Sequence, residues 1–119
     1  MSNELIKKPG ISYKFNENIY VEELMDVINN TYKGHYSREQ FQATEFIIDG
    51  GHGAGFCIGN IMKYAQRYGK KGSSDDARKD IMKVLHYAIM MLHVHDSEEF
   101  DKFADIDSSS PEEYKYDTD

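Results

Sequence analysis

The stretch SSDDARKDIMKVLHYAIMMLHVH, residues 73–95, decides the fold class. Ser74 is a good N-cap, and the carboxylates of Asp75 and Asp76 follow where they complement the helix dipole. Apolar residues then recur at helical spacing over several turns, which predicts an amphipathic helix from about Asp75 to His95. We expect its buried stripe to consist of Ala77, Ile81, Val84, Leu85, Ala88 and Leu92.

The residues before this helix predict three more helices. An N-cap at Asn18 begins the first, and the capping-box pair Ser37 and Gln40 begins the second. The segment 49–55 holds four glycines within six residues and predicts a loop or a sharp break. No period-2 pattern indicates a strand. The fold class is therefore all-α, a small bundle of about four helices, with the earlier three over residues 18–32, 37–48 and 56–68.

The two ends of the chain differ from its middle. Residues 1–17 contain Pro9 and Gly10 and predict an irregular arm. Residues 105–119 are acidic and rich in serine, with little to bury, so we expect a flexible or loosely docked tail. The helical domain is expected over residues 18–104, with a short helical turn within 97–103.

Length and composition exclude several classes of protein. The 119 residues suffice for one domain, and the net charge of −7 argues against a duplex-DNA binder. No apolar run approaches the roughly 18 residues of a membrane span, and the N-terminus lacks the apolar region of a signal peptide. The single Cys57 excludes an internal disulfide and a cysteine zinc site. These features favour a protein of a reducing cytoplasm.

One segment carries the opposite charge to the rest. Residues 60–83 hold seven Lys and Arg against three Asp, whereas both flanking segments are acidic. A local cationic segment attracts small anions even on an acidic protein. The alternative is a solvated helix face on which the lysines only add solubility.

Two helical rows within this segment carry candidate chemistry. The third predicted helix presents an amide, an ammonium, a phenol and a guanidinium on one face, from Asn60, Lys63, Tyr64 and Arg67. The fourth presents Asp80, Lys83 and Tyr87. If the rows meet, the cations suit phosphates, the rings suit a base, and Asn60 suits a base edge or ribose. The alternative is surface salt bridging of Asp80 with Lys83 or Arg67.

Other motifs give weaker indications. The glycines before the third helix expose backbone N–H groups to an anion or form a plain connector, and no Walker loop is present. The five histidines do not form a metal-binding pattern. Glu45, Asp49 and Asp80 are carboxylates that could serve a Mg²⁺ ion arriving with a nucleotide. Cys57 is expected to be a packed thiol.

The sequence resembles a small phage-encoded domain, best known from the nucleotide kinase of podophages related to the T-odd coliphages and otherwise found in phage proteins of unknown function. The match covers about residues 35–95. It rests mainly on the run Gly-Asn-x-x-Lys-Tyr-x-x-Arg-x-Gly-Lys-Lys at residues 59–71. The chain departs from the family in its glycine-rich 50–55 and in lacking the kinase's N-terminal extension. Matching positions are Asn60, Lys63, Tyr64, Arg67, Lys70, Lys71, Asp80, Lys83 and Tyr87, and more weakly His35, Tyr36 and Glu45.

The resemblance implies a phage protein of the host cytoplasm that binds a (deoxy)nucleotide and phosphorylates deoxynucleoside monophosphates without a Walker loop. The candidate residues for phosphate transfer are Lys63, Arg67 and Asp80, and Glu45 and Asp80 are the candidate ligands of Mg²⁺ that arrives with the nucleotide. Two alternatives remain: a non-catalytic sponge for a host nucleotide signal, and an inhibitor of a host protein.

Because Met90 and Met91 cannot both face the stripe, we also expect a homo-oligomer with sites near subunit interfaces; the alternative is one partly exposed methionine.

Overall fold

The computed structural model describes residues 10–34, 37–70 and 72–99, with side chains given as far as Ser97. Over these ranges the chain is all-α, as predicted, with no strand. The elements are α1 (Glu17–Lys33), α2 (Ser37–Ile47), the π-helical turn η2 (Ile48–His52), α3 (Gly53–Arg67), α4 (Ser74–Val94) and the π-helical turn η3 (His95–Glu99). The predicted residues 1–9, His35, Tyr36, Lys71 and 100–119 lie outside the described part.

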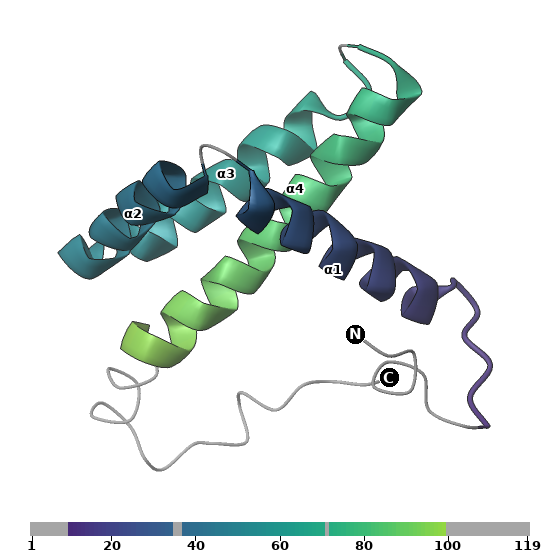
Figure 1. The fold of residues 1–119 in the computed structure, drawn as a ribbon, viewed down its shortest axis with the longest axis horizontal. Helices are drawn as coiled ribbons and strands as arrows, with labels where there is room; N and C mark the ends of the chain where they lie inside the picture. Colours follow the sequence, from purple (N-terminus) through teal and green to yellow (C-terminus); the bar gives the residue numbers. More distant parts are fainter. Residues whose placement is uncertain (1–9, 35–36, 71, 100–119) are drawn as a thin grey trace.

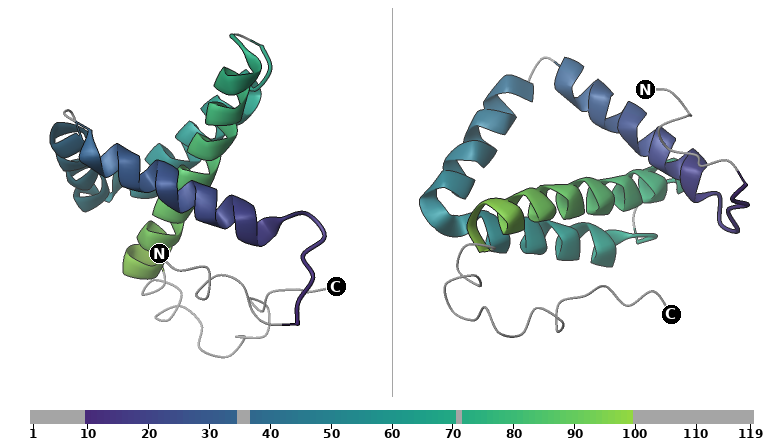
Figure 2. Two further views of the ribbon diagram at one scale, coloured as in Figure 1. Left: turned by 45° about the vertical axis from the view of Figure 1, so that its right-hand side comes forward. Right: turned by 90° about the horizontal axis from the view of Figure 1, so that it is seen from below.

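The long hairpin of α3 and α4 is the scaffold of the molecule (Figure 1). The two helices run antiparallel, so the start of α3 lies beside the end of α4. Helix α1 crosses α4, and α2 lies beside the start of α3 (Figure 2). Helices α1 and α2 therefore cover one side of the hairpin. No described helix is long and apolar enough to cross a membrane.

The helix starts differ from the predicted ones. The N-cap of α1 is Asn16, which has a left-handed φ of 58°, rather than Asn18. Ser37 is the first residue of α2 rather than its cap, and its hydroxyl donates to the carbonyls of Gly34 (2.7 Å) and Tyr32 (3.1 Å). The Ser37 hydroxyl thereby links the start of α2 to the end of α1. Residue spacing within one helix cannot predict such a contact between two helices.

A capping box starts α4 one residue earlier than predicted. Ser73, not Ser74, is the N-cap, and its hydroxyl accepts from the Asp76 N–H at 3.3 Å. The Asp76 carboxylate accepts from the Ser73 N–H at 3.0 Å. This backbone hydrogen bond lowers the pKa of Asp76, and the Ser73 hydroxyl lowers it further. The cap fixes the direction in which α4 leaves the turn.

The glycine-rich segment makes a sharp break and not a long loop. Gly51 alone in this segment has a left-handed φ, 88°, which a residue with a Cβ adopts at a cost. Gly53 then begins α3, three residues before the predicted start. A Cβ on Gly53 would lie 3.0 Å from a Val94 methyl and 3.2 Å from Ile48, so glycine allows α3 and α4 to approach closely here.

We expect opposite effects from two alanine substitutions in α3. Gly53→Ala should lower stability by about 1–3 kcal/mol, because the added methyl overpacks the fully buried Val94. Gly55→Ala, where a Cβ meets nothing within 4 Å, should raise stability by about 0.5–1 kcal/mol. Denaturant unfolding of both variants measures the difference. Equal effects at the two positions would contradict the close approach.

The buried core is small. Among the described apolar side chains only Leu24, Cys57, Tyr64, Met82 and Val94 are buried. The packed thiol predicted at Cys57 is confirmed, and burial raises its pKa. The small core leaves much apolar surface exposed on the helices.

The prediction of which face of α4 is buried is wrong. Ile81, Leu85 and Leu92 are 44%, 38% and 64% exposed. The face of α4 that packs on α3 instead carries Asp80 and Val94, which are buried. Helix α4 has apolar residues on two sides and a partly polar row between them. Hydrophobic periodicity alone predicted that the more hydrophobic of these two sides is buried.

Candidate functional site

The α3–α4 hairpin brings the two predicted rows together. The guanidinium of Arg67 donates two hydrogen bonds to Asp80 Oδ1, from Nε at 3.1 Å and from Nη2 at 2.6 Å. The Asp80 side chain is 3% exposed and that of Arg67 is 44% exposed. The hydrogen bond with Asp80 raises the pKa of Arg67. One of the two salt bridges considered from the sequence is therefore formed, and its carboxylate is buried.

Aromatic rings and cations surround this ion pair. Tyr64 stacks with Tyr87 at a centroid distance of 6.0 Å and an interplanar angle of 12°. Lys63 Nζ and Arg67 Cζ each lie 4.9 Å from the Tyr64 ring centroid, and Lys83 Nζ lies 5.3 Å from it. We call Lys63, Tyr64, Arg67, Lys83 and Tyr87 the Tyr64 cluster. Three cations around one ring repel each other, which favours an added anion.

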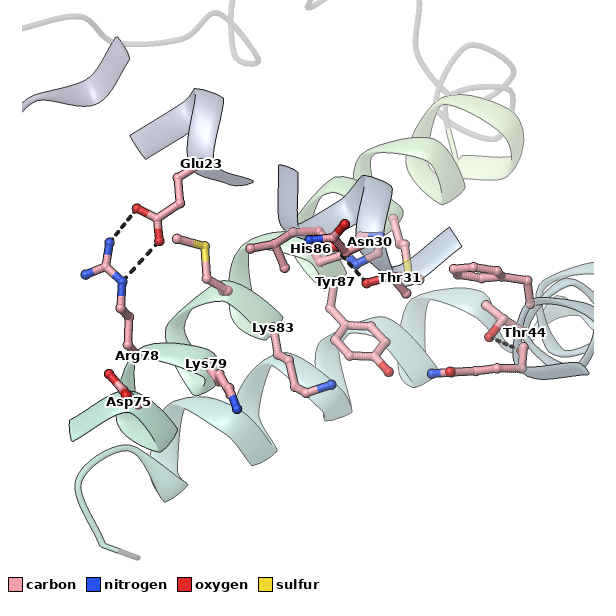
Figure 3. A pocket seen from close by; sticks show the side chains of 15 residues that line it. Glu23, Asn30, Thr31, Thr44, Asp75, Arg78, Lys79, Lys83, His86 and Tyr87 are labelled. Atoms are coloured by element: carbon pink, nitrogen blue, oxygen red, sulfur yellow. Dashed lines mark hydrogen bonds and ion pairs between the residues drawn. The ribbon is translucent and has the colours of Figure 1, made fainter. Parts of the chain in front are cut away.

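A groove adjoins the Tyr64 cluster on the side of α1 and α2 (Figure 3). Its volume is about 570 Å³, within the range of ligand pockets. Lys83 and Tyr87 belong to both the cluster and the groove. The walls come mainly from Val27, Asn30 and Thr31 of α1, from Gln40, Phe41 and Thr44 of α2, and from Lys79, Met82, Lys83, His86, Tyr87 and Met90 of α4.

Besides its apolar residues and the carboxylates of Glu23 and Asp75, the groove presents three kinds of side chain. Lys79 and Lys83 lie one turn apart on α4 and supply positive charge (Figure 3). Tyr87 and Phe41 supply rings, and Tyr32 stacks on Phe41 at a centroid distance of 4.4 Å. Asn30 and Gln40 supply amides that donate and accept hydrogen bonds. The arrangement therefore suits a ligand with an anionic end and a flat polar end.

An ion pair joins α1 and α4 at one end of the groove. Arg78 donates two hydrogen bonds to the carboxylate of Glu23, one of them from Nε at 3.0 Å (Figure 3). The hydrogen bonds raise the pKa of Arg78. The Arg78 guanidinium also lies 5.7 Å from the Tyr20 ring centroid. These contacts join α1 to the N-terminal half of α4 at this end of the groove.

Partial burial shifts the pKa of two groove residues. Desolvation lowers the pKa of His86, and the positive charge of Lys83 lowers it further. Desolvation also raises the pKa of Tyr87, so its phenol stays protonated at neutral pH. His86 is therefore a neutral ring beside Lys83 at pH 7. A bound anion would offset the charge of Lys83, the second of these causes, and so raise the pKa of His86.

The remaining predicted residues are more scattered. The Asn60 amide donates to the carbonyl of Phe56 at 2.9 Å within its own helix. Lys70 is exposed after the end of α3, 3.3 Å from Gln66 Oε1, and Glu45 is exposed on α2. His35, Tyr36 and Lys71 lie outside the described residues. Tyr64 is only 9% exposed, so its ring supports Tyr87 and the cations and does not offer a free face.

Metal binding by these carboxylates remains a prediction. In the described ranges no three His, Cys, Asp or Glu side chains gather as a metal site. Asp80 accepts both hydrogen bonds from Arg67, so its carboxylate would bind Mg²⁺ only if that ion pair opened. Glu45 is exposed and available. The arrangement does not fit a preformed Mg²⁺ site centred on Asp80.

Sequence reasoning missed most of the groove, because only Lys83 and Tyr87 of its lining were predicted as site residues. Lys79 and His86 share the helical spacing of Lys83 and Tyr87, so the pattern on α4 could have included them. Asn30, Gln40 and Phe41 come from α1 and α2, whose approach to α4 is not encoded in local spacing. That approach depends on long-range contacts such as the Arg78–Glu23 ion pair.

The fold and groove define a small all-α protein with a partly apolar groove lined by several cations. A family model described as a protein of unknown function, DUF3310, matches residues 7–88, so the chain belongs to that family. Comparison with curated proteins and with solved structures found no significant match to either.

Proposed function

We propose that this protein binds a nucleotide or deoxynucleotide in the groove between α1, α2 and α4. The observation that carries the proposal is the pairing of Lys79 and Lys83 with the Tyr87 ring on one wall. The groove volume of about 570 Å³ accommodates a nucleoside with its phosphates. The Tyr64 cluster behind this wall adds positive charge and supports Tyr87 by stacking.

Each part of a nucleotide has a matching group. Ammonium groups hold phosphate as point charges, which suits Lys79 and Lys83. Tyr87 and Phe41 offer ring surface against a base, and stacking of this kind is worth about 1–3 kcal/mol per base. The amides of Asn30 and Gln40 can read a base edge or a sugar hydroxyl. The proposal names the ligand class and leaves the base to experiment.

The resemblance to the phage nucleotide kinase supports a finer proposal, phosphorylation of deoxynucleoside monophosphates. Transfer would draw on Lys63 and Arg67, with Mg²⁺ supplied together with the nucleotide. The burial of Asp80 in its ion pair with Arg67 favours the second candidate, a protein that sequesters a nucleotide without transfer. The inhibitor of a host protein draws no support from the groove.

One incubation series separates these functions. The protein is mixed with ATP, Mg²⁺ and each deoxynucleoside monophosphate in turn, and diphosphate formation is followed by chromatography. Turnover supports the kinase. Saturable binding without turnover supports the sequestering protein. The absence of both for every nucleotide, checked by calorimetry, contradicts the proposed binding and favours a protein partner.

A further inference from the structure

The outer side of the α3–α4 hairpin carries several exposed apolar side chains from both helices. Five large apolar side chains on it are between 38% and 65% exposed, those of Ile58, Met62, Ile81, Leu85 and Leu92. A shallow apolar depression lies within it, lined in part by Ile61, Ala88 and Leu92. None of the described helices covers this side, because α1 and α2 lie across the other one (Figure 2). We call it the hairpin face and define it by Ile58, Ile61, Met62, Ile81, Leu85, Ala88 and Leu92.

The spacing on α4 identifies the shape of what binds there. Ile81, Leu85, Ala88 and Leu92 follow one another at intervals of four, three and four residues. This is the heptad pattern by which one helix packs against another. No charged residue interrupts the stripe. The surface therefore fits an apolar helix rather than a polar ligand.

We propose that a second copy of this chain packs on the hairpin face, with the two α4 helices antiparallel about a two-fold axis near residues 86 and 87. The stripe is symmetric about this point. Reversal places Ile81 opposite Leu92 of the second copy and Leu85 opposite its Ala88. A surface that matches itself under reversal is what an isologous dimer requires.

The charges beside the stripe match the same arrangement. Arg78 lies near the start of α4 and Asp96 lies in η3, directly after the end of α4, so the two opposite charges stand at opposite ends of the helix. The antiparallel arrangement brings Arg78 of one copy toward Asp96 of the other at both ends. Both residues are exposed, and the guanidinium of Arg78 has donors beyond the two that Glu23 accepts.

The small core favours a partner that is always present. The described part of the chain buries only five apolar side chains, while the hairpin face stays open. The stripe from Ile81 to Leu92 is about 18 Å long and a helix pair is about 20 Å wide, so the apolar face presents on the order of 360 Å² in projection. The polar turns of α3 and α4 on either side of the face supply the rest of the roughly 800 Å² per partner that a specific interface buries. A second copy accompanies the chain wherever it is made.

The hairpin face and the groove lie on different sides of α4. The groove uses Lys79, Lys83 and His86, and the face uses Ile81, Leu85 and Leu92. Dimer formation therefore leaves the groove open. The inference goes beyond nucleotide binding and does not depend on it.

Sedimentation equilibrium of the full chain tests the dimer. Wild type should sediment as a dimer at micromolar concentration, and Leu85→Glu should raise the dimer dissociation constant about 100-fold or more, because it places two carboxylates at the two-fold axis. Phe46→Glu is the control, since Phe46 is 81% exposed on α2, away from the face. A monomeric wild type, as expected if the tail or another protein covered the face, would overturn the proposal. So would a Leu85→Glu variant that dimerises like wild type.

Disulfide trapping tests the orientation and does not require a destabilising change. Ile81→Cys and Leu92→Cys chains are prepared separately, mixed and oxidised; Cys57 is fully buried and stays unreacted. The antiparallel dimer predicts mixed 81–92 cross-links. Like positions would lie about 16 Å apart along the axis, too far for a disulfide. Cross-links only between like positions would indicate parallel helices and refute the arrangement.

Discussion

Arg67→Ala should lower the melting temperature by on the order of 10 °C or more, because it leaves the buried carboxylate of Asp80 without its partner. Circular dichroism melts measure the change. The double variant Arg67→Ala, Asp80→Ala should recover much of the loss, since it removes the buried charge as well. Removal of one member of a buried pair costs more than removal of both.

Lys63→Ala provides the matched control for this result. Lys63 is an exposed cation one turn earlier on α3, near the same Tyr64 ring. The Lys63→Ala substitution should change the melting temperature by no more than about 2 °C, as expected for the loss of an exposed charge. Equal melting temperatures for Lys63→Ala and Arg67→Ala would show that the ion pair does not support the hairpin.

Lys83→Ala should weaken nucleotide affinity about 10–100-fold, the range for loss of one charge-assisted hydrogen bond to phosphate. Lys83 is the best single test because it lines the groove and also belongs to the Tyr64 cluster. Its side chain is exposed, so the fold should survive the substitution. Isothermal titration calorimetry measures the affinities.

Lys14→Ala is the control for net charge in this experiment. Lys14 is an exposed lysine before α1 and does not line the groove. The Lys14→Ala substitution removes one positive charge, as Lys83→Ala does, and should leave the nucleotide affinity within about twofold of wild type. The nucleotide affinity of wild type should also fall as the salt concentration rises, and that of Lys83→Ala should fall less. This difference would support a contact between Lys83 and phosphate. Equal affinities of wild type and Lys83→Ala would place the phosphates elsewhere.

The sequence predicted the all-α fold, because helix periodicity and glycine breaks are local properties. It also predicted the row on α4 that meets α3, since Asp80 and Tyr87 were selected by their chemistry and not by hydrophobicity. It failed to identify the buried side of α4. A helix with Met82 on one side and Leu85 on another has two apolar faces, and only the placement of α1 and α2 determines which one is covered.

For the same reason, the sequence predicted only the part of the candidate site that lies on α3 and α4. The Tyr64 cluster could be predicted because α3 and α4 are consecutive and antiparallel. The far wall of the groove could not, because Asn30 reaches it through the crossing of α1 over α4 and Phe41 through the placement of α2. The role of Arg67 also needed the structure. Spacing alone was consistent with a ligand-binding guanidinium and with the ion pair that forms.

A nuclear magnetic resonance titration with a nucleotide panel at neutral pH tests the central claim most directly, because it reports both binding and its place. The proposal predicts that at least one nucleotide shifts the signals of Asn30, Lys83 and Tyr87 saturably and raises the pKa of the His86 ring, since a bound phosphate offsets the charge of Lys83. Signals of Lys14 should stay in place. Saturable shifts confined to other parts of the chain, or none with any nucleotide, would contradict nucleotide binding in this groove.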